Sequence, residues 1–129
     1  MANIPDDLLY TPDHEYVKST ADPNVVIVGI TDYAQDQLGD VVFVELPQPG
    51  ATFHAHDVFG TVEAVKTVAD LYAPLSGEVV EVNSRLDSEP QLVNTDPYGE
   101  GWMIKLRVSE PSEREQLLSA EAYRAHIGA

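Results

Sequence analysis

Short runs of valine and other β-forming residues, each ended by glycine, proline, asparagine or aspartate, recur along the chain of 129 residues. Runs rich in β-branched and aromatic residues and bounded by turn-forming residues are typical of short β-strands. Many short strands at regular intervals favour an all-β sandwich or barrel over a helical fold. The runs that we predict to be strands are 25–30, 41–46, 58–65, 78–83 and 102–108.

Helical signals are confined to two segments. Asp32, with a glutamine three residues later, has the pattern of a capped helix start, and Gly39 marks the end of that helix. Ser112, with a glutamate three residues later, has the pattern of a capping box and predicts helix over 111–127. No linker divides the chain, and its length suits one core, so we expect a single domain, 1–129, with this helical segment packed on it.

The charge of the chain argues against several classes of partner. There are 22 acidic and 7 basic side chains, and the formal net charge is −15. A negative field repels nucleic acids and anionic membrane surfaces, and no apolar run approaches the roughly 20 residues that span a bilayer. The acidic N-terminal residues lack the features of a signal peptide, so we expect a cytoplasmic protein. Because the chain has no cysteine, it has no thiol chemistry of its own.

A six-residue pattern occurs twice. Residues 39–44 and 77–82 both have the order glycine, acid, valine, valine, any residue, valine. The repeat indicates two similar β halves, although glycine followed by valines also arises by chance in strands. The segment between the halves would form a protruding hairpin with strands 58–65 and 68–72, and the tip would lie at Lys66.

Lys66 has unusual surroundings. It is the only lysine or arginine between Lys18 and Arg85. Tight hairpins normally turn on glycine or asparagine, whereas Val65 and Val68 flank the lysine and threonine here. A type I turn accommodates these residues. Most lysines are simply solvated, but the position of Lys66 at a turn, among acidic residues, counts against that interpretation.

The residues around Lys66 resemble those of a known family. The segment from Glu63 to Asp70, with Gly50 sixteen residues before the lysine and Gly77 eleven residues after it, resembles the lipoyl-lysine hairpin of the H proteins of the glycine cleavage system. Biotin carriers differ, because they have methionine on both sides of the lysine. Similar blocks occur in the same order as in the H proteins over nearly the whole chain, at 10–17, 29–50, 73–83 and 94–106.

The resemblance implies a barrel-sandwich hybrid, which is an all-β fold of two pseudo-symmetric halves, with short peripheral and C-terminal helices. It implies that lipoate is amide-linked to Lys66, that Glu63 and Val65 belong to the attachment site, and that Gly50 and Gly77 are turn glycines. The chain would be a carrier and not an enzyme. It would shuttle the aminomethyl intermediate of glycine decarboxylation between three enzymes.

The partners that the resemblance implies are the pyridoxal-phosphate-dependent glycine decarboxylase (P protein), the tetrahydrofolate-dependent aminomethyltransferase (T protein) and dihydrolipoamide dehydrogenase (L protein). A lipoyl-attaching enzyme is the fourth partner. The carrier itself is expected to be a monomer.

The loaded arm would carry a primary amine, which requires a cleft that excludes water and supplies negative groups. By their positions in the family pattern, Glu15, Asp70 and Asp13 are the acids expected to dock this amine. The chain departs from the family near the predicted site. Ala64 and Ala69 replace two serines that are common in the family. Tyr16 replaces a tryptophan, and Tyr33 replaces a histidine.

Other functions stay open at the level of sequence. The chain could serve another lipoyl complex or store lipoate, or it could be an unmodified binding domain in which Lys66 stays bare. His54 and His56 would lie on one face of a strand and suggest a metal-dependent enzyme. Two ligands without a third form a weak site, so we expect no metal.

Overall fold

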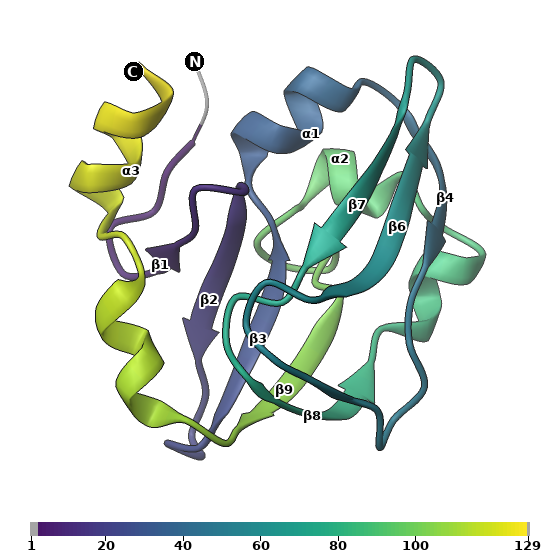
Figure 1. The fold of residues 1–129 in the computed structure, drawn as a ribbon. Coiled ribbons are helices and arrows are strands. Elements are labelled where there is room, and N and C mark those ends of the chain that lie inside the picture. The colour runs from purple at the N-terminus through teal and green to yellow at the C-terminus, as the bar shows by residue number, and fades with distance from the viewer. Residues whose placement is uncertain (1–2, 129) are drawn as a thin grey trace.

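The computed structural model of the chain describes residues 3–128, which form two antiparallel β-sheets with short helices around them (Figure 1). The larger sheet has the strand order β1-β2-β3-β9-β8-β5 and the smaller sheet has the order β4-β6-β7. The predicted all-β class is therefore confirmed. The strands of the larger sheet, in that order, are Leu9–Tyr10, Glu15–Ser19, Val25–Ile30, Ile104–Val108, Gly77–Val82 and Thr52–Phe53. Those of the smaller sheet are Val41–Glu45, Val58–Ala64 and Val68–Tyr72.

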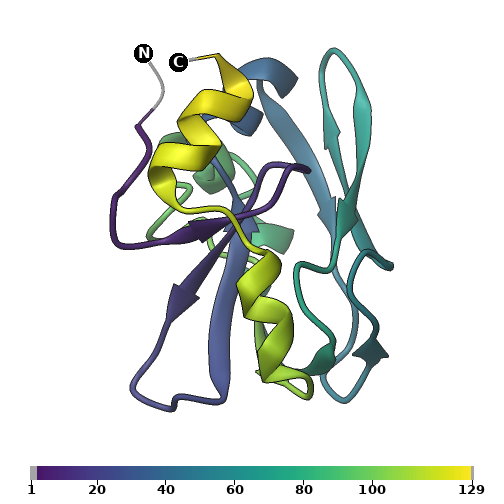
Figure 2. The ribbon, with the colours of Figure 1, turned by 60° about the vertical axis from the view of Figure 1, so that its left-hand side comes forward.

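The helices are short and lie at the edges of the sheets. In Figures 1 and 2, α1 lies near the β6–β7 hairpin, whereas α3 lies beside the N-terminal residues. No helix within residues 3–128 is long and apolar enough to cross a membrane. The α-helices are α1 (Asp32–Leu38), α2 (Leu92–Thr95) and α3 (Ala120–Ile127), and the 3-10 helices are η1 (Ser84–Asp87) and η2 (Pro111–Gln116).

The main core lies between the two sheets. Alternate strand residues face inward, so that Val28 and Leu106 of the larger sheet and Val62 of the smaller sheet are buried together. A second cluster lies under α3, where the ring of Tyr123 stacks on the ring of Tyr10 with 4.7 Å between ring centroids. The helix α3 is thus fixed to the larger sheet by aromatic packing.

The predicted strands agree with the structure at 25–30 and 68–72, and the others differ by one or two residues at their ends. The three strands that were not predicted are β1, β2 and β5. Two of them have only two residues, and β2 has the mixed sequence EYVKS. Helix α1 ends at Gly39 as predicted, but its cap is Thr31, whose hydroxyl accepts a hydrogen bond from the Ala34 amide (3.1 Å), and not Asp32.

The C-terminal segment 111–127 is not the continuous helix that its pattern predicts. Between η2 and α3, the backbone of Leu118 exchanges two hydrogen bonds with Tyr10, of 2.8 and 2.7 Å. This pairing with β1 holds the stretch extended and interrupts the helix. Ser119 caps α3, whereas the predicted cap Ser112 lies inside η2.

Candidate functional site

The hairpin formed by β6 and β7 projects from the body of the molecule (Figure 1). Its tip is Val65, Lys66 and Thr67, and the Ala64 amide donates a hydrogen bond to the Thr67 carbonyl (2.8 Å). None of these residues has a positive φ. The tip therefore needs no glycine, which agrees with the tolerance expected of a type I turn.

The turn between α1 and β4 supports the tip. The Val65 amide donates a hydrogen bond to the carbonyl of Asp40 (2.9 Å). Gly39 has a φ of +80°, and a Cβ atom built on it would lie 3.3 Å from Cε of Lys66. The side chain of Lys66 is exposed, but its aliphatic part lies against this turn.

Asn94 holds that turn in place. Its Oδ1 accepts a hydrogen bond from the Val41 amide (2.8 Å), and its Nδ2 donates to the Gly39 carbonyl and to Oε1 of Gln35, both at 2.9 Å. Asn94 was not among the residues predicted to form the site. No local signal marks it, because its partners lie more than fifty residues away along the chain.

A cleft of about 320 Å³ lies between α1, the turn before β2, and the hairpin. Its apolar lining includes Ile30 and Val62. Leu38 also lines the cleft and precedes Gly39, so the cleft begins next to the turn against which the aliphatic part of Lys66 lies. The acids that line this cleft are the three that the sequence analysis selected for amine docking, Asp13, Glu15 and Asp70.

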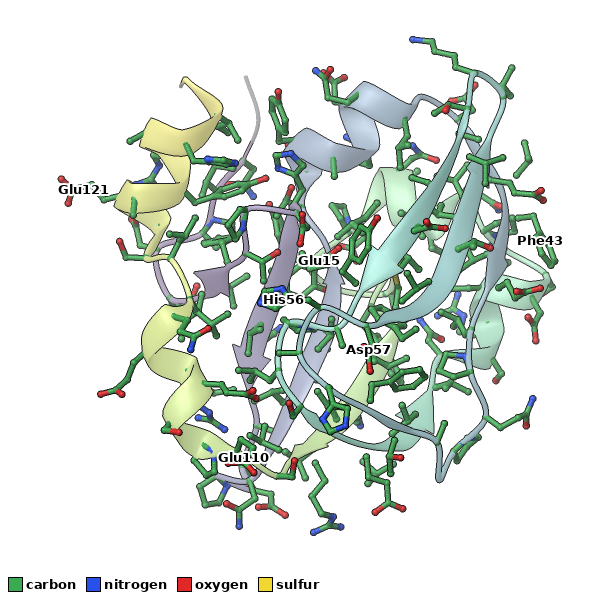
Figure 3. The ribbon with its side chains drawn as sticks, viewed as in Figure 1. Glu15, Phe43, His56, Asp57, Glu110 and Glu121 are labelled. Atoms are coloured by element: carbon green, nitrogen blue, oxygen red, sulfur yellow. The ribbon has the colours of Figure 1, made fainter. Side chains whose placement is uncertain are left out.

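Glu15 differs from the other two acids because it is buried. Only 2% of the residue is exposed, and Figure 3 shows it between β2 and the hairpin. Its Oε1 accepts a hydrogen bond from the Thr11 hydroxyl (2.8 Å), and its Oε2 accepts one from the Tyr72 amide (3.3 Å). Burial raises the pKa of Glu15 to about 8, although both hydrogen bonds oppose that rise. Glu15 therefore holds a proton at neutral pH, whereas Asp13 and Asp70 are exposed.

His14 is a cleft residue that the sequence analysis missed. It has a φ of +70°, and its Nδ1 lies 2.8 Å from the hydroxyl of Tyr123 in α3. The same hydroxyl lies 2.8 Å from Oγ1 of Thr31, the cap of α1. Burial, and then the nearby His126, lower the pKa of His14. Tyr123 thus joins two walls of the cleft, and no pattern around residue 123 predicts that contact.

His54 and His56 do not share a strand face, so that expectation was wrong. They lie in the turn after β5, where His56 has a φ of +76°. The His54 amide donates to Oδ2 of Asp57 (2.8 Å), which closes the turn. In the part of the chain that the structure describes, no group of three or more histidine and acidic side chains is placed to hold a metal ion.

The chain is similar to proteins of known family. Residues 8–128 match the family model described as Glycine cleavage H-protein. The chain is 58% identical over 126 residues to the glycine cleavage system H protein of Chlorobium limicola, with 98% of each chain covered. It is also 58% identical to that of Symbiobacterium thermophilum, with 97% of this chain and 96% of the relative covered.

The fold is also similar to a solved structure. The crystal structure of a glycine cleavage system H protein from Mycobacterium marinum matches with a TM-score of 0.85 and 44% sequence identity. The match covers 98% of this chain and 100% of the other. The predicted barrel-sandwich hybrid is therefore confirmed.

Proposed function

We propose, for a chain that belongs to the glycine cleavage H-protein family, that Lys66 is the residue that carries its lipoyl group. Proteins of this family carry lipoyl-lysine and are carriers and not enzymes. This chain is accordingly the lipoyl carrier of glycine cleavage, with lipoate as its cofactor.

The exposure of the Lys66 amine supports this choice over the other two lysines. Nζ of Lys105 lies 3.1 Å from Oε1 of Glu81 and over the ring of Trp102. Nζ of Lys18 lies 3.4 Å from the Tyr98 carbonyl. Both lysines are on strands of the larger sheet. No hydrogen bond or ion pair within residues 3–128 engages the Lys66 amine, and its hairpin projects into solvent.

The cleft fits a lipoyl arm that folds back from Lys66. Its apolar walls suit a hydrocarbon chain and a dithiolane ring, and the buried carboxyl of Glu15 suits an amine at the end of the arm. When bound, the lipoyl group supplies the disulfide that takes up the aminomethyl group. We assign the amine to Glu15, with Asp70 and Asp13 at the rim of the cleft.

Glu63 and Val65 are the other residues of the proposed attachment site, and Gly50 and Gly77 are proposed as structural glycines. Glu63 and Val65 lie beside the lysine on the hairpin. Gly50 has a φ of +95°, which only glycine adopts at low cost, and a Cβ atom on Gly77 would overlap the carbonyl oxygen of Arg107. Gly77 thus admits the close approach of β9 to β8, and the Gly50 amide donates a hydrogen bond to the Val79 carbonyl of β8 (2.7 Å).

As a component of the glycine cleavage system, the chain works with other proteins of that system. The P, T and L proteins and a lipoyl-attaching enzyme are the partners that we propose. A net charge of −15 attracts partners that have basic docking faces. We further propose that residues 1–129 act as one monomeric domain, and a cytoplasmic location stays a prediction.

Tryptic mapping of native protein tests the attachment. Trypsin cleaves after unmodified lysine or arginine, and Lys66 is the only such residue between Lys18 and Arg85. Lipoylated protein should therefore yield one uncut peptide, 19–85, that carries the whole added mass. Cleavage after Lys66, with the lipoyl mass on Lys18 or Lys105, would show that the assignment is wrong.

The Lys66→Arg variant is the matched control. It keeps the charge and the aliphatic contact with Gly39, so its free energy of unfolding should stay within about 0.5 kcal/mol of the wild-type value. It should accept no lipoyl group and support no glycine-dependent release of CO₂ with the P protein. If lipoylated wild type also failed to support that release, the chain would serve another complex or store lipoate.

A further inference from the structure

The large apolar side chains that remain exposed are gathered on one sheet. Single exposed apolar residues are common on proteins. In residues 3–128, however, all of the large ones lie in the β4-β6-β7 sheet or its hairpin tip, and such grouping indicates a contact surface. These residues are Val42, Phe43, Val58, Val65 and Val68, with exposed fractions of 55, 45, 47, 73 and 60%.

Three side chains near the tip form a row across this sheet. Glu63 on β6 pairs with Phe43 on β4 and with Val68 on β7. Directly paired residues have neighbouring side chains, and all three are exposed, so one carboxylate lies between two apolar groups. Val65 continues the apolar surface towards Lys66. We name the surface formed by Phe43, Glu63, Val65 and Val68 the tip face.

The tip face and the cleft lie on opposite sides of the hairpin. Val62 and Ala69 pair with each other one position further along the strands, and both line the cleft. Because neighbouring strand residues point to opposite faces, Glu63 and Val68 point away from the cleft. Figure 3 shows Phe43 on the outer side of the sheet, directed away from the body of the molecule. A protein bound to the tip face would leave the cleft open.

We propose that the tip face is the docking surface of the lipoyl-attaching enzyme, which meets it with an apolar area that carries one basic side chain opposite Glu63. This inference rests on the proposed attachment at Lys66. The attaching enzyme must bring the Lys66 amine itself to the reacting carbonyl carbon, so it has to cover the residues around the lysine. Enzymes that act on the dithiolane meet the far end of the arm instead.

The chemistry of the tip face defines the partner surface. Phe43, Val65 and Val68 stabilise a contact only if the partner covers them with apolar groups. Covering them also removes water from Glu63, which has no ion-pair partner within residues 3–128. An unpaired carboxylate is costly to bury, so the enzyme must supply the cation.

Attachment kinetics test the inference. A lipoate ligase, lipoate and ATP are supplied to the unmodified carrier, and the modified fraction is followed by intact mass. Phe43→Ser and Val68→Ser should each raise the KM for the carrier about ten-fold, with kcat within about two-fold of wild type. Val58→Ser is the matched control, because Val58 is as exposed as Phe43 but pairs with Tyr72 at the other end of the hairpin. Its KM should not change.

The charge in the tip face has its own test. Glu63→Lys should raise the KM more than Glu63→Gln, because the lysine repels the cation of the partner. Equal KM values for these two variants would contradict the cation opposite Glu63. Thermal unfolding of each variant identifies any that fails to fold, and Val68→Ser, the more exposed site, then decides the apolar part of the inference.

Four further outcomes of these measurements would each point to a different explanation of the tip face or of Lys66. Wild-type KM in both serine variants, with Lys66 modified normally in wild type, would overturn the inference and leave the proposed function intact. Failure of the ligase to modify wild-type Lys66 would instead overturn the proposed function. If the fully lipoylated Phe43→Ser carrier had a raised KM for the P protein while attachment was unaffected, the tip face would serve the decarboxylase. A wild-type dimer that Phe43→Ser abolishes in sedimentation would assign the tip face to a second copy.

Discussion

At the scale of single residues, Glu15 shows what burial adds to a sequence motif. Its selection as a docking acid came from its position in the family pattern, and the expectation was a charged carboxylate. In the cleft, burial raises the pKa of Glu15 to about 8, so Glu15 is a neutral acid at pH 7. An incoming amine cation would stabilise the ionised form. Docking of the loaded arm is then coupled to release of a proton from Glu15.

This linkage predicts the pH dependence of stability. Unfolded Glu15 ionises near pH 4.5, whereas folded Glu15 keeps its proton to about pH 8. The contribution of Glu15 is fully present below pH 4.5 and is lost as the pH rises towards 8. It is on the order of 3 to 5 kcal/mol across this range. Urea unfolding at several pH values should show that Glu15→Gln removes this decline.

An exposed acid of the same cleft, Asp70, provides the control for Glu15. Asp70→Asn makes the same change of carboxyl to amide at the rim of the cleft. It should leave the decline with pH in place, and a profile of Glu15→Gln equal to that of wild type would contradict the burial argument. The lifetime of the aminomethyl intermediate can also be measured after the arm is loaded with glycine and the P protein. The ratio of this lifetime in wild type to that in Glu15→Gln should increase as the pH rises from 6 to 8, because docking releases a proton.

At the scale of elements, the turn between α1 and β4 orients the tip of the β6–β7 hairpin. Asn94→Ala removes the three side-chain hydrogen bonds that hold this turn and should lower the free energy of unfolding by about 1 to 3 kcal/mol. Hydrogen exchange locates the effect. The Val65 amide, which is bonded to Asp40, should exchange faster, whereas the Ala64 amide, which is bonded within the hairpin to Thr67, should change less.

Equal acceleration at both amides would mean that Asn94 stabilises the protein without orienting the tip. The comparison is internal to one variant, because the two amides are neighbours in the same hairpin. A shift of exchange at Val65 alone would show that the tip has separated from the turn while the hairpin itself stays paired.

The elements also show which parts of the fold local sequence predicts. Strands such as 25–30 were predicted because their signal is contiguous. The two copies of the repeat, by contrast, have the same sequence pattern, but their glycines have different structural roles. Gly39 ends a helix with a positive φ, and Gly77 admits a close approach of β9. The break before α3 was not predictable, because Leu118 is extended only through its pairing with Tyr10, more than a hundred residues earlier.

At the scale of the whole molecule, the cleft is assembled from segments that are distant in sequence. Lys66 and the acids of the cleft could be singled out from the sequence because they lie in contiguous motifs. The contacts that shape the cleft could not, since the hydroxyl of Tyr123 in α3 meets His14 and Thr31 only in the folded chain. The C-terminal helix is therefore part of the structure that forms the cleft, although it does not itself line the cleft.

Tyr123→Phe tests this role of α3. The substitution keeps the ring that stacks on Tyr10 but leaves the polar atoms of His14 and Thr31 without their partner, so the free energy of unfolding should fall by about 1 to 3 kcal/mol. Tyr10→Phe is the matched control. It removes a hydroxyl that donates to the Pro5 carbonyl (2.6 Å), in the same aromatic stack but away from the cleft.

The two variants should differ in the lifetime of the aminomethyl group on the loaded arm. After loading with glycine and the P protein and removal of that enzyme, Tyr123→Phe should release formaldehyde and ammonia several-fold faster than wild type, because His14 and the start of α1 lose their common anchor. Tyr10→Phe should release them at the wild-type rate, although it also loses a tyrosine hydrogen bond. Equal acceleration in both variants would show that α3 contributes only global stability. Acceleration by Tyr123→Phe alone would show that the far end of the chain shapes the cleft that protects the aminomethyl group.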